Sequence, residues 1–194
     1  MTASPARLTQ DDYFAFALKV LAEGSHEDLT IQAMCDGLQI TKGSFYHHFG
    51  SFPGFVEAFL HHWERETAVN VENLARRIES VTMRQRFMEA LIETIPHDAE
   101  AAIRVWARTD PTVRAVQERV DKSRTTMLAD FFVLHMPMAQ ARLIGELYNA
   151  VLVAGQMSSK PVAVKSLRQQ MTALSKLVVG RYGHIFRDDV PAKR

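Results

Sequence analysis

The chain has 194 residues, of which 47% are hydrophobic and 23% charged, and its formal net charge is +1 at pH 7. This composition is ordinary for a folded globular protein and excludes a disordered or low-complexity chain. The single cysteine, Cys35, excludes an internal disulfide, and no apolar stretch approaches the roughly 20 residues that span a bilayer. The amino terminus has no secretory signal, so we expect a soluble cytoplasmic protein without a membrane partner.

Apolar residues recur at helical spacing nearly everywhere, and no convincing strand-like alternation is present. Thr9 is a candidate N-cap for a first helix, and Asp12 stands three residues later in the position that completes a capping box. Gly24 is the candidate end of this helix.

Two shorter helices follow, each opened by a threonine in the capping position. Thr30 precedes apolar residues spaced i, i+3, i+4 and i+7, and Thr41 precedes a helix that we expect to end near Phe49 and Gly50. Two short helices joined by a few residues, with a small polar cap on the second, are the layout of a helix-turn-helix.

Prolines and polar caps divide the rest of the chain into longer helices. Asp110 suits an N-cap, and Pro111 suits the first helical position. The longer helices are expected over residues 55–80, 83–95, 98–108, 111–135, 139–158 and 162–179. The predicted fold is all-α with about nine helices, divided into an N-terminal three-helix helix-turn-helix domain (1–52) and a C-terminal helical bundle (53–194).

The segment TKGSFYHHFGSF, residues 41–52, places two adjacent histidines among aromatic residues. On a helical wheel, Phe45 and Phe49 share one side and His48 flanks them. The opposite side carries Gly43, Ser44, Tyr46 and His47, with Lys42 at the amino-terminal end. Adjacent histidines on one helix cannot face one ion, because a helical metal pair needs i, i+3 or i+4 spacing. We therefore expect no metal site, with a mixed pairing of His48 and His61 left open.

The outer side of this third helix has side chains that suit DNA. A helix of about eight residues is about 12 Å long, which matches the width of the major groove. Two helix amino termini add partial positive charge for phosphates. The alternative is a polar surface on a small helical bundle, and spacing alone does not decide between the two.

The run TIQAMCDGLQITKGSFYHHF, residues 30–49, resembles the DNA-binding signature of TetR-family transcriptional regulators. Its most specific part is ITKGSFYHHF, with a hydrophobic residue, a Ser/Thr cap, lysine, glycine, a small residue and then the aromatic, tyrosine, histidine and phenylalanine positions. The later helices are similar to the family in layout only, as a long connecting helix and then a ligand-binding, dimerising bundle. The resemblance implies a homodimer on a two-fold symmetric double-stranded DNA operator that responds to a small molecule.

The resemblance also implies roles for individual residues. Thr30 and Tyr46 would contact phosphates, and Lys42 the DNA backbone near the helix start. Ser44 and His47 would approach bases or phosphates, while Phe45 and Phe49 anchor the helix in the core. The implied DNA-binding set is Thr30, Gln32, Lys42, Gly43, Ser44, Tyr46 and His47.

This chain departs from the family pattern at both edges of the third helix. Gln39 stands where the family usually has a glycine, and a left-handed conformation there would cost about 1 kcal/mol. Phe52 and Pro53 follow Ser51, where the family often has a phosphate-contacting lysine. Up to residue 62 the chain has three basic and seven acidic residues, a net charge of −4. We therefore expect few ionic phosphate contacts and a shallow salt dependence of DNA binding.

The later helices carry the candidate effector pocket. Its apolar or amphipathic members, with two amides as polar handles, are Phe87, Trp106, Phe131, Tyr148, Asn149 and Gln156. Such a pocket would suit a small, mostly apolar effector, although ordinary bundle core is the alternative for each residue. Arg104 and Arg108, one turn apart, could receive an anion, but a solvated face is the favoured interpretation.

Small residues in the helix expected over 139–158 would let another helix approach closely. They are Ala141, Gly145, Ala150, Ala154 and Gly155, and the final helix offers Leu167, Met171, Leu174 and Leu177 at core spacing. These two helices are predicted to form a two-fold, four-helix dimer interface. The alternative is that they form the interior of a monomer.

No nucleophile–base constellation, phosphate-binding glycine loop or carboxylate pair indicates catalysis, and we expect neither enzymatic activity nor a cofactor. The favoured function is a ligand-responsive DNA-binding transcriptional regulator, with repression as the expected direction. An alternative is a TetR-like helical dimer that binds another protein and binds DNA weakly or not at all. A helical enzyme with His47 or His48 as its base is a third, and it would need a substrate cleft beside that helix.

Overall fold

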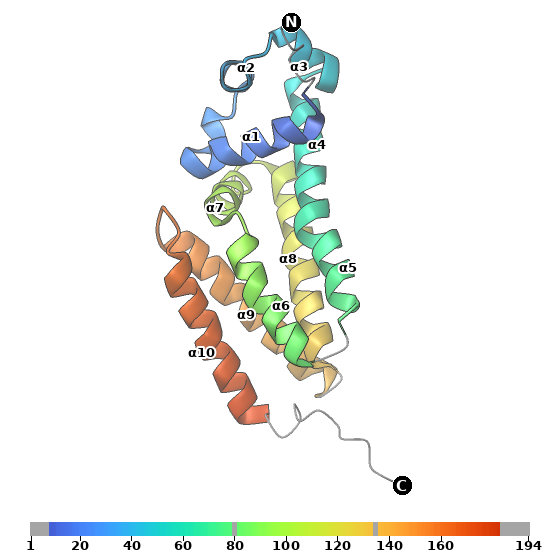
Figure 1. Cartoon of the computed structure of the whole chain (residues 1–194), viewed down its shortest axis with the longest axis vertical. Coiled ribbons are helices and arrows are strands. Elements are labelled where there is room, and N and C mark those ends of the chain that lie inside the picture. Colours follow the sequence, from blue (N-terminus) through green and yellow to red (C-terminus); the bar gives the residue numbers. More distant parts are fainter. Residues whose placement is uncertain (1–7, 79–80, 134–135, 183–194) are drawn as a thin grey trace, which may run out of the picture.

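A computed structural model of the chain describes residues 8–78, 81–133 and 136–182, and every regular element among them is helical. The predicted all-α class is confirmed. The molecule is elongated, with α2 and α3 at one end and α6, α9 and α10 toward the other (Figure 1). The elements are α1 (Gln10–Glu23), the 3-10 turn η1 (His26–Asp28), α2 (Ile31–Leu38), α3 (Lys42–Phe49), α4 (Phe52–Glu64), the π-helical turn η2 (Arg65–Val69), α5 (Asn70–Arg76), α6 (Val81–Thr94), α7 (His97–Trp106), α8 (Pro111–Phe132), α9 (Met138–Ser158) and α10 (Val164–Tyr182).

The three amino-terminal α-helices begin at the predicted caps. The Asp12 carboxylate accepts from the backbone N–H and the hydroxyl of Thr9, at 2.7 and 2.8 Å, at the start of α1. The hydroxyls of Thr30 and Thr41 each accept from the backbone N–H three residues further on, at 3.1 Å in both cases. These bonds satisfy donors that the first helical turn would otherwise leave without partners.

The long helix after this region starts earlier than predicted. Ser51 Oγ accepts from the backbone N–H of Gly54 at 3.0 Å, so α4 begins at Phe52 rather than at Phe55. Pro53 lies in the first turn, where its missing N–H donor costs nothing. A polar cap followed by proline is the local signal for this start.

The same helical path is also not α-helical throughout, because η2 interrupts it between α4 and α5. Residues 65–69 form a π-helical turn, in which the backbone N–H of Asn70 bonds to the carbonyl of Arg65. Thr67 Oγ1 donates to the carbonyl of Trp63 at 2.6 Å beside this turn. Nothing in the apolar spacing marks the turn, and the sequence prediction missed it.

The later helices begin and end within a few residues of their predicted bounds. The Asp110 carboxylate caps α8 as predicted, accepting from the N–H groups of Thr112 and Val113 at 2.8 and 3.1 Å. The last helix is shifted toward the carboxyl terminus and spans Val164–Tyr182. The predicted helix ends at residues 80 and 135 lie outside the described residues.

Two apolar cores hold these helices together. The first joins α1, α2, α3 and α4 to α7 and the start of α8, through side chains such as Phe14, Phe45, Phe55, Trp63 and Ile103. In Figure 1, α7 lies directly beneath α1, and the two helices are in close contact. This core contains residues from both sides of the predicted division at 52/53, so no break in the packing marks that division.

The second core fills the other half of the molecule. It joins α5 and α6 to α8, α9 and α10, through side chains such as Ile92, Leu128, Tyr148 and Leu167. Among the described residues, no helix combines the length and apolar character needed to cross a membrane.

Candidate functional site

The turn between α2 and α3 is formed by residues 39–41. Gln39 has φ 55° and ψ 45°, the left-handed conformation considered for this position in place of a glycine. The N–H of Ile40 bonds back to the carbonyl of Cys35 at 3.0 Å, so the turn closes the end of α2. The angle between the two short helices is therefore set by local backbone bonding, at a strain cost of about 1 kcal/mol.

Aromatic packing sets the orientation of α3. Phe45 is fully buried, and its ring centroid lies 5.3 Å from that of Phe49, 5.3 Å from that of Phe55 in α4 and 6.2 Å from that of Tyr13 in α1. Burying one such side chain contributes about 1.5–3 kcal/mol, so a rotation of α3 that exposed it would be strongly unfavourable. The predicted inner side of this helix is confirmed.

The other side of α3 faces solvent at the end of the molecule. Lys42, Gly43, Tyr46 and His47 are exposed, and the Tyr46 side chain remains 45% exposed although it is aromatic. A Cβ built on Gly43 would find only Thr41 Oγ1 within 4 Å, at 3.7 Å. The backbone of the first turn of α3 is therefore open to close approach from outside.

The remaining three candidates differ in how free their polar groups are. Thr30 is exposed at the start of α2, where its hydroxyl caps the helix. Gln32 is exposed as well, but its amide donates to Asp36 Oδ1 at 2.8 Å. Ser44, predicted on the outer side, is half-buried, and its hydroxyl lies 3.3 Å from the hydroxyl of Tyr13 in α1. Six of the seven predicted DNA-contact residues are thus exposed, and Ser44 is turned inward.

The two adjacent histidines diverge as predicted. His47 is exposed, whereas His48 is half-buried with its ring centroid 5.0 Å from that of Tyr13. Within the described part of the chain, no group of three His, Cys, Asp or Glu side chains is arranged to hold a metal ion.

The candidate effector residues fall into different parts of the molecule. Trp106 belongs to the first core and stacks on His26, with ring centroids 5.6 Å apart. Phe87, Phe131 and Tyr148 lie in or against the second core. Their joint role in one pocket stays a prediction.

Two polar groups of that candidate set have contrasting surroundings. The hydroxyl of Tyr148 lies 2.7 Å from that of Ser175, and burial raises the pKa of this phenol. Asn149 is half-buried, and its Oδ1 has no hydrogen-bond partner. Of these two side chains, Asn149 is therefore the one with an unused polar atom for a ligand.

The last candidate, Gln156, belongs to a set of buried and half-buried polar residues whose association sequence reasoning missed. We call this set the buried polar cluster; it consists of His97, Glu100 and Arg104 of α7, Gln117, Asp121 and Arg124 of α8, and Gln156 of α9. Their spacing is i, i+3, i+7 on α7 and i, i+4, i+7 on α8, which places each group on one helical face. That spacing was the available signal, because it repeats on two successive helices.

The buried polar cluster contains two bidentate ion pairs. Arg124 donates through both Nη atoms to the carboxylate of Glu100, at 3.0 and 2.5 Å. Arg104 donates through both Nη atoms to the carboxylate of Asp121, at 2.7 Å each. Gln156 joins the pairs, because its amide donates to Glu100 at 2.8 Å and its carbonyl accepts from Arg104 Nε at 3.0 Å.

Charge pairing outweighs burial in this cluster. Burial alone would raise the pKa of Glu100, but Arg124 holds the pKa of that carboxyl below its usual value. Burial likewise opposes Arg104 at Asp121, and the pKa of Asp121 is also lowered. The solvated-face interpretation of Arg104 was wrong, since its side chain is only 9% exposed.

Gln117 is the unsatisfied member of the cluster. The residue is buried, and neither its amide nitrogen nor its carbonyl oxygen has a hydrogen-bond partner within bonding geometry. It nevertheless lies close enough to Asp121 to help lower the pKa of that carboxyl. An unpaired amide of this kind is rare in a protein interior.

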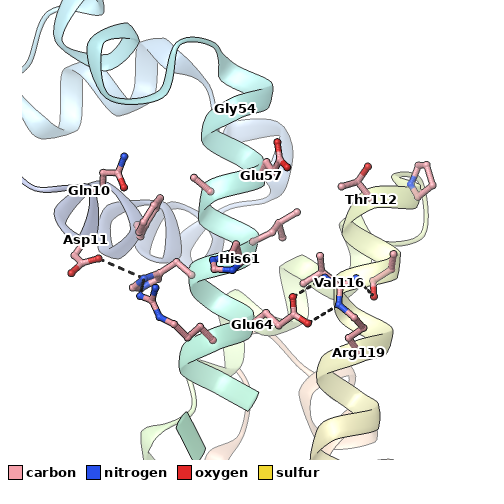
Figure 2. A pocket seen from close by; sticks show the side chains of 16 residues that line it. Gln10, Asp11, Gly54, Glu57, His61, Glu64, Thr112, Val116 and Arg119 are labelled. Atoms are coloured by element: carbon pink, nitrogen blue, oxygen red, sulfur yellow. Dashed lines mark hydrogen bonds and ion pairs between the residues drawn. The ribbon is translucent and has the colours of Figure 1, made fainter. Parts of the chain in front are cut away.

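A groove of about 870 Å³ is lined by side chains of α1, α4 and the start of α8 (Figure 2). At its edge Arg119 donates to both carboxylate oxygens of Glu64, at 2.6 and 2.7 Å, and lowers the pKa of that carboxyl. Across the groove, His62 Nδ1 lies 3.1 Å from Arg65 Nη2 and 3.6 Å from Asp11 Oδ1. No sequence pattern marks the Glu64–Arg119 pair, because its partners are 55 residues apart.

The outward side of α9 carries exposed apolar residues. We call the set Leu143, Leu147, Ala150, Ala154 and Met157 the α9 stripe; all five are exposed, with successive spacings of four, three, four and three residues. Leu143 is 55% exposed and Leu147 45%. Spacing of this kind places every member on one side of the helix.

The other small residues of α9 serve contacts within the chain. A Cβ on Gly145 would lie 2.6 Å from the backbone oxygen of Thr125 in α8, and one on Gly155 would lie 2.6 Å from Leu167 in α10. Leu167 and Met171 are buried in the second core. Of the residues predicted at the dimer interface, those that are exposed are Ala150, Ala154 and Leu177. The first two belong to the α9 stripe, whose other three members the prediction did not name.

Comparison of the chain with protein-family models and with curated proteins gives no match.

Proposed function

We propose that this protein is a cytoplasmic, ligand-responsive DNA-binding transcriptional regulator in which α2 and α3 form a helix-turn-helix. The observation that carries the proposal is the orientation of α3. Phe45 and Phe49 hold the helix from beneath, while Lys42, Tyr46 and His47 are presented to solvent. An eight-residue helix is about 12 Å long, which suits insertion into the major groove of B-DNA.

The same surface has several means of engaging phosphates. The amino termini of α2 and α3 carry partial positive charge, and Thr30 and Lys42 lie at those two termini. The exposed hydroxyl end of Tyr46 adds a donor, and Gly43 lets the DNA backbone approach the helix. In this proposal these groups set the position on DNA, and His47 contacts base edges.

A gel-shift assay with the intergenic DNA upstream of the protein's own gene tests this proposal. We expect wild-type protein to shift the DNA and Tyr46→Ala to weaken binding about ten-fold, because a hydrogen bond to a charged phosphate is lost. Tyr46→Phe removes the hydroxyl and keeps the ring, so it distinguishes the contributions of these two groups to DNA binding. Leu74→Ala, at a side chain that is 52% exposed on α5, is the matched surface control. No shift by wild type, or an unchanged shift with Tyr46→Ala, refutes the proposal.

We further propose that the protein acts as a homodimer joined through the α9 stripe. Its four-three spacing is that of the apolar seam of paired helices, and a two-fold axis would lay the stripe against its own copy. Burial of such a stripe would remove large apolar side chains from water, which favours association. A symmetric pair of α3 helices would then read two half-sites of a palindromic operator.

Size-exclusion chromatography with light scattering tests the dimer. We expect wild type to have twice the 21.9 kDa mass of one chain, and Leu147→Glu to run as a monomer. The matched control is Leu74→Glu, which places the same charge on an exposed leucine outside the stripe. A wild-type monomer, or a Leu147→Glu dimer, would contradict this interface.

The effector is proposed to bind within the second core, beside Phe87, Phe131 and Tyr148. The support for this placement is Asn149, whose Oδ1 is buried without a partner. A buried polar atom left unpaired costs about 1–3 kcal/mol, and a ligand donor would recover that cost. Trp106 packs in the first core and is therefore a less direct candidate for the same ligand.

A second function is favoured by the charge of the amino-terminal helices. With three basic and seven acidic residues up to residue 62, this region would repel a polyanion at long range. In this alternative the protein is a TetR-like helical dimer whose α3 surface binds another protein. A stable dimer that shifts no upstream DNA at low salt would favour this function over the first.

A further inference from the structure

The buried polar cluster is unused by either DNA binding or dimerisation. It places two guanidinium groups and two carboxylates among α7, α8 and α9, and the Glu100 and Arg124 side chains are only 1% and 7% exposed. Desolvation offsets most of the attraction within a buried ion pair, so such a pair is weak evidence of a purely stabilising role. Stabilisation of the fold is therefore not a sufficient explanation for the cluster, and we consider a role in binding.

The two ion pairs differ in how accessible they are. The Asp121 side chain is 26% exposed, whereas that of its partner Arg104 is 9% exposed. Asp121 thus lies at the rim of the cluster and Arg104 behind it. The two Nη atoms of the Arg104 guanidinium, which form a fork, donate to the two oxygens of Asp121 at 2.7 Å each. This geometry already accepts a carboxylate in bidentate fashion.

Gln117 supplies an independent indication of a ligand. It lies one helical turn before Asp121 on α8, and both of its side-chain polar atoms are buried without hydrogen-bond partners. A carboxylate that replaced Asp121 on Arg104 would take the position beside this amide that the Asp121 carboxylate now holds. The amide of Gln117 could then donate to the incoming oxygen and satisfy its own donor.

We propose that Arg104 anchors a binding site for a small molecule bearing one carboxylate, and that Asp121 occupies Arg104 when the molecule is absent. On binding, the Asp121 side chain turns toward solvent, and the ligand carboxylate takes its two hydrogen bonds from Arg104. This inference rests on the proposed function, because the ligand would be the effector, with its carboxylate at Arg104 and its apolar part toward Asn149. Asn149 lies about two turns before Gln156, the α9 residue that bonds to Arg104. It adds a single negative charge to the mostly apolar molecule expected from the sequence.

The position of Arg104 on α7 connects this site to the DNA-binding helices. One side of α7 carries the cluster, and the other side packs against α1 through the first core, which includes Ile103 and Trp106. A ligand with different affinities for two positions of α7 would shift the balance between them. The same shift would act on α1 and, through Tyr13 and Phe45, on α3.

Isothermal titration calorimetry with three ring compounds of nearly the same shape tests the inference: benzoate, neutral benzamide and cationic benzamidine. We expect wild type to bind benzoate and neither of the others. Asp121→Asn removes the internal competitor and should tighten benzoate binding at least ten-fold. Arg104→Lys keeps the charge but loses the fork, and should weaken binding at least ten-fold.

The matched control is Glu93→Gln, which frees the exposed Arg168 in the same way that Asp121→Asn frees Arg104. It should leave benzoate binding unchanged. Circular dichroism reports whether each variant is folded. If Arg104→Lys is unfolded, the benzoate affinity of Asp121→Asn alone tests the inference. Benzoate affinity that is absent, or equal in wild type and Asp121→Asn, overturns the inference, as does a preference for benzamidine.

Gel shifts separate this inference from the proposed function. A protein that shifts its upstream DNA but binds no benzoate keeps the regulatory function and loses the carboxylate site. A protein that binds benzoate through Arg104 but shifts no DNA keeps the site and loses the regulatory function.

Discussion

Because α8 and α9 approach closely at Gly145, we expect even the methyl group of an alanine at this position to lower the free energy of unfolding. A Cβ on Gly145 would lie 2.6 Å from the carbonyl oxygen of Thr125, 3.2 Å from the backbone nitrogen of Ala129 and 3.4 Å from Leu128 Cβ. The two nearest atoms belong to the backbone, so no side-chain rotation relieves the clash and the helices must separate. Overpacking costs about 1–3 kcal/mol, and the better helix propensity of alanine returns up to about 1 kcal/mol. We expect Gly145→Ala to lose about 1–2 kcal/mol, because backbone must move.

Thermal and urea unfolding followed by circular dichroism, at one fixed protein concentration, measure this loss. For a chain of this size, 1–2 kcal/mol corresponds to a fall in Tm of about 2–8 °C. The matched control is Gly180→Ala in α10, where an added Cβ has no heavy atom within 4 Å. That variant should be unchanged or more stable by up to about 1 kcal/mol. A Gly145→Ala protein as stable as wild type would refute the close packing of α8 on α9.

Three further predictions concern the turn, an ion pair and the DNA surface. Gln39→Gly should leave the free energy of unfolding unchanged or raise it by up to about 1 kcal/mol, because relief of left-handed strain is partly offset by chain entropy. Gln39→Ala should bring no gain. If urea unfolding shows that the glycine variant is less stable than wild type by more than about 0.5 kcal/mol, the strain is contradicted. Because Arg119 lowers the pKa of Glu64, this pair stabilises the fold above the unfolded-state pKa near 4.5 and loses that effect as pH falls through the folded-state pKa. Glu64→Gln should thus cost about 0.5–1 kcal/mol at neutral pH and almost nothing near about pH 3 in urea titrations, and a cost that persists in acid argues against the ion pair. For DNA binding, the slope of log K against log salt should be shallower than about −6, and a steeper slope would show more phosphate contacts than this surface provides.

The features that were predictable from sequence are those in which cause and effect lie within a few residues. Thr9, Thr30, Thr41 and Asp110 cap helices by bonding to groups two or three residues away, so the residue type and its place before an apolar run are enough to identify them. The left-handed turn at Gln39 is local in the same sense. The sorting of α3 into inner and outer sides follows from helical periodicity alone, except at Ser44.

Features that depend on a distant partner were missed or assigned to the wrong partner. Gly145 and Gly155 permit a close helix neighbour, but composition does not tell whether that neighbour is in the same chain, and here it is. Arg104 has the same local sequence whether it faces water or Asp121, which is 17 residues away. The buried partner decides between these outcomes, and only the packing of α7 on α8 brings it there.

The π-helical turn η2 lies between two contacts that tie the long helical path to α8. Glu64 bonds to Arg119 before the turn, and Glu72 accepts from Ser123 Oγ at 3.1 Å after it. A π turn bonds residue i to i+5 instead of i+4, so it accommodates one extra residue without rotating the helix beyond it. Deleting one residue within 65–69 would therefore keep both contacts aligned, whereas a deletion elsewhere in α4 would turn α5 by about 100°. Any alignment of this chain with one that is a single residue shorter in this helix should place its gap at this turn.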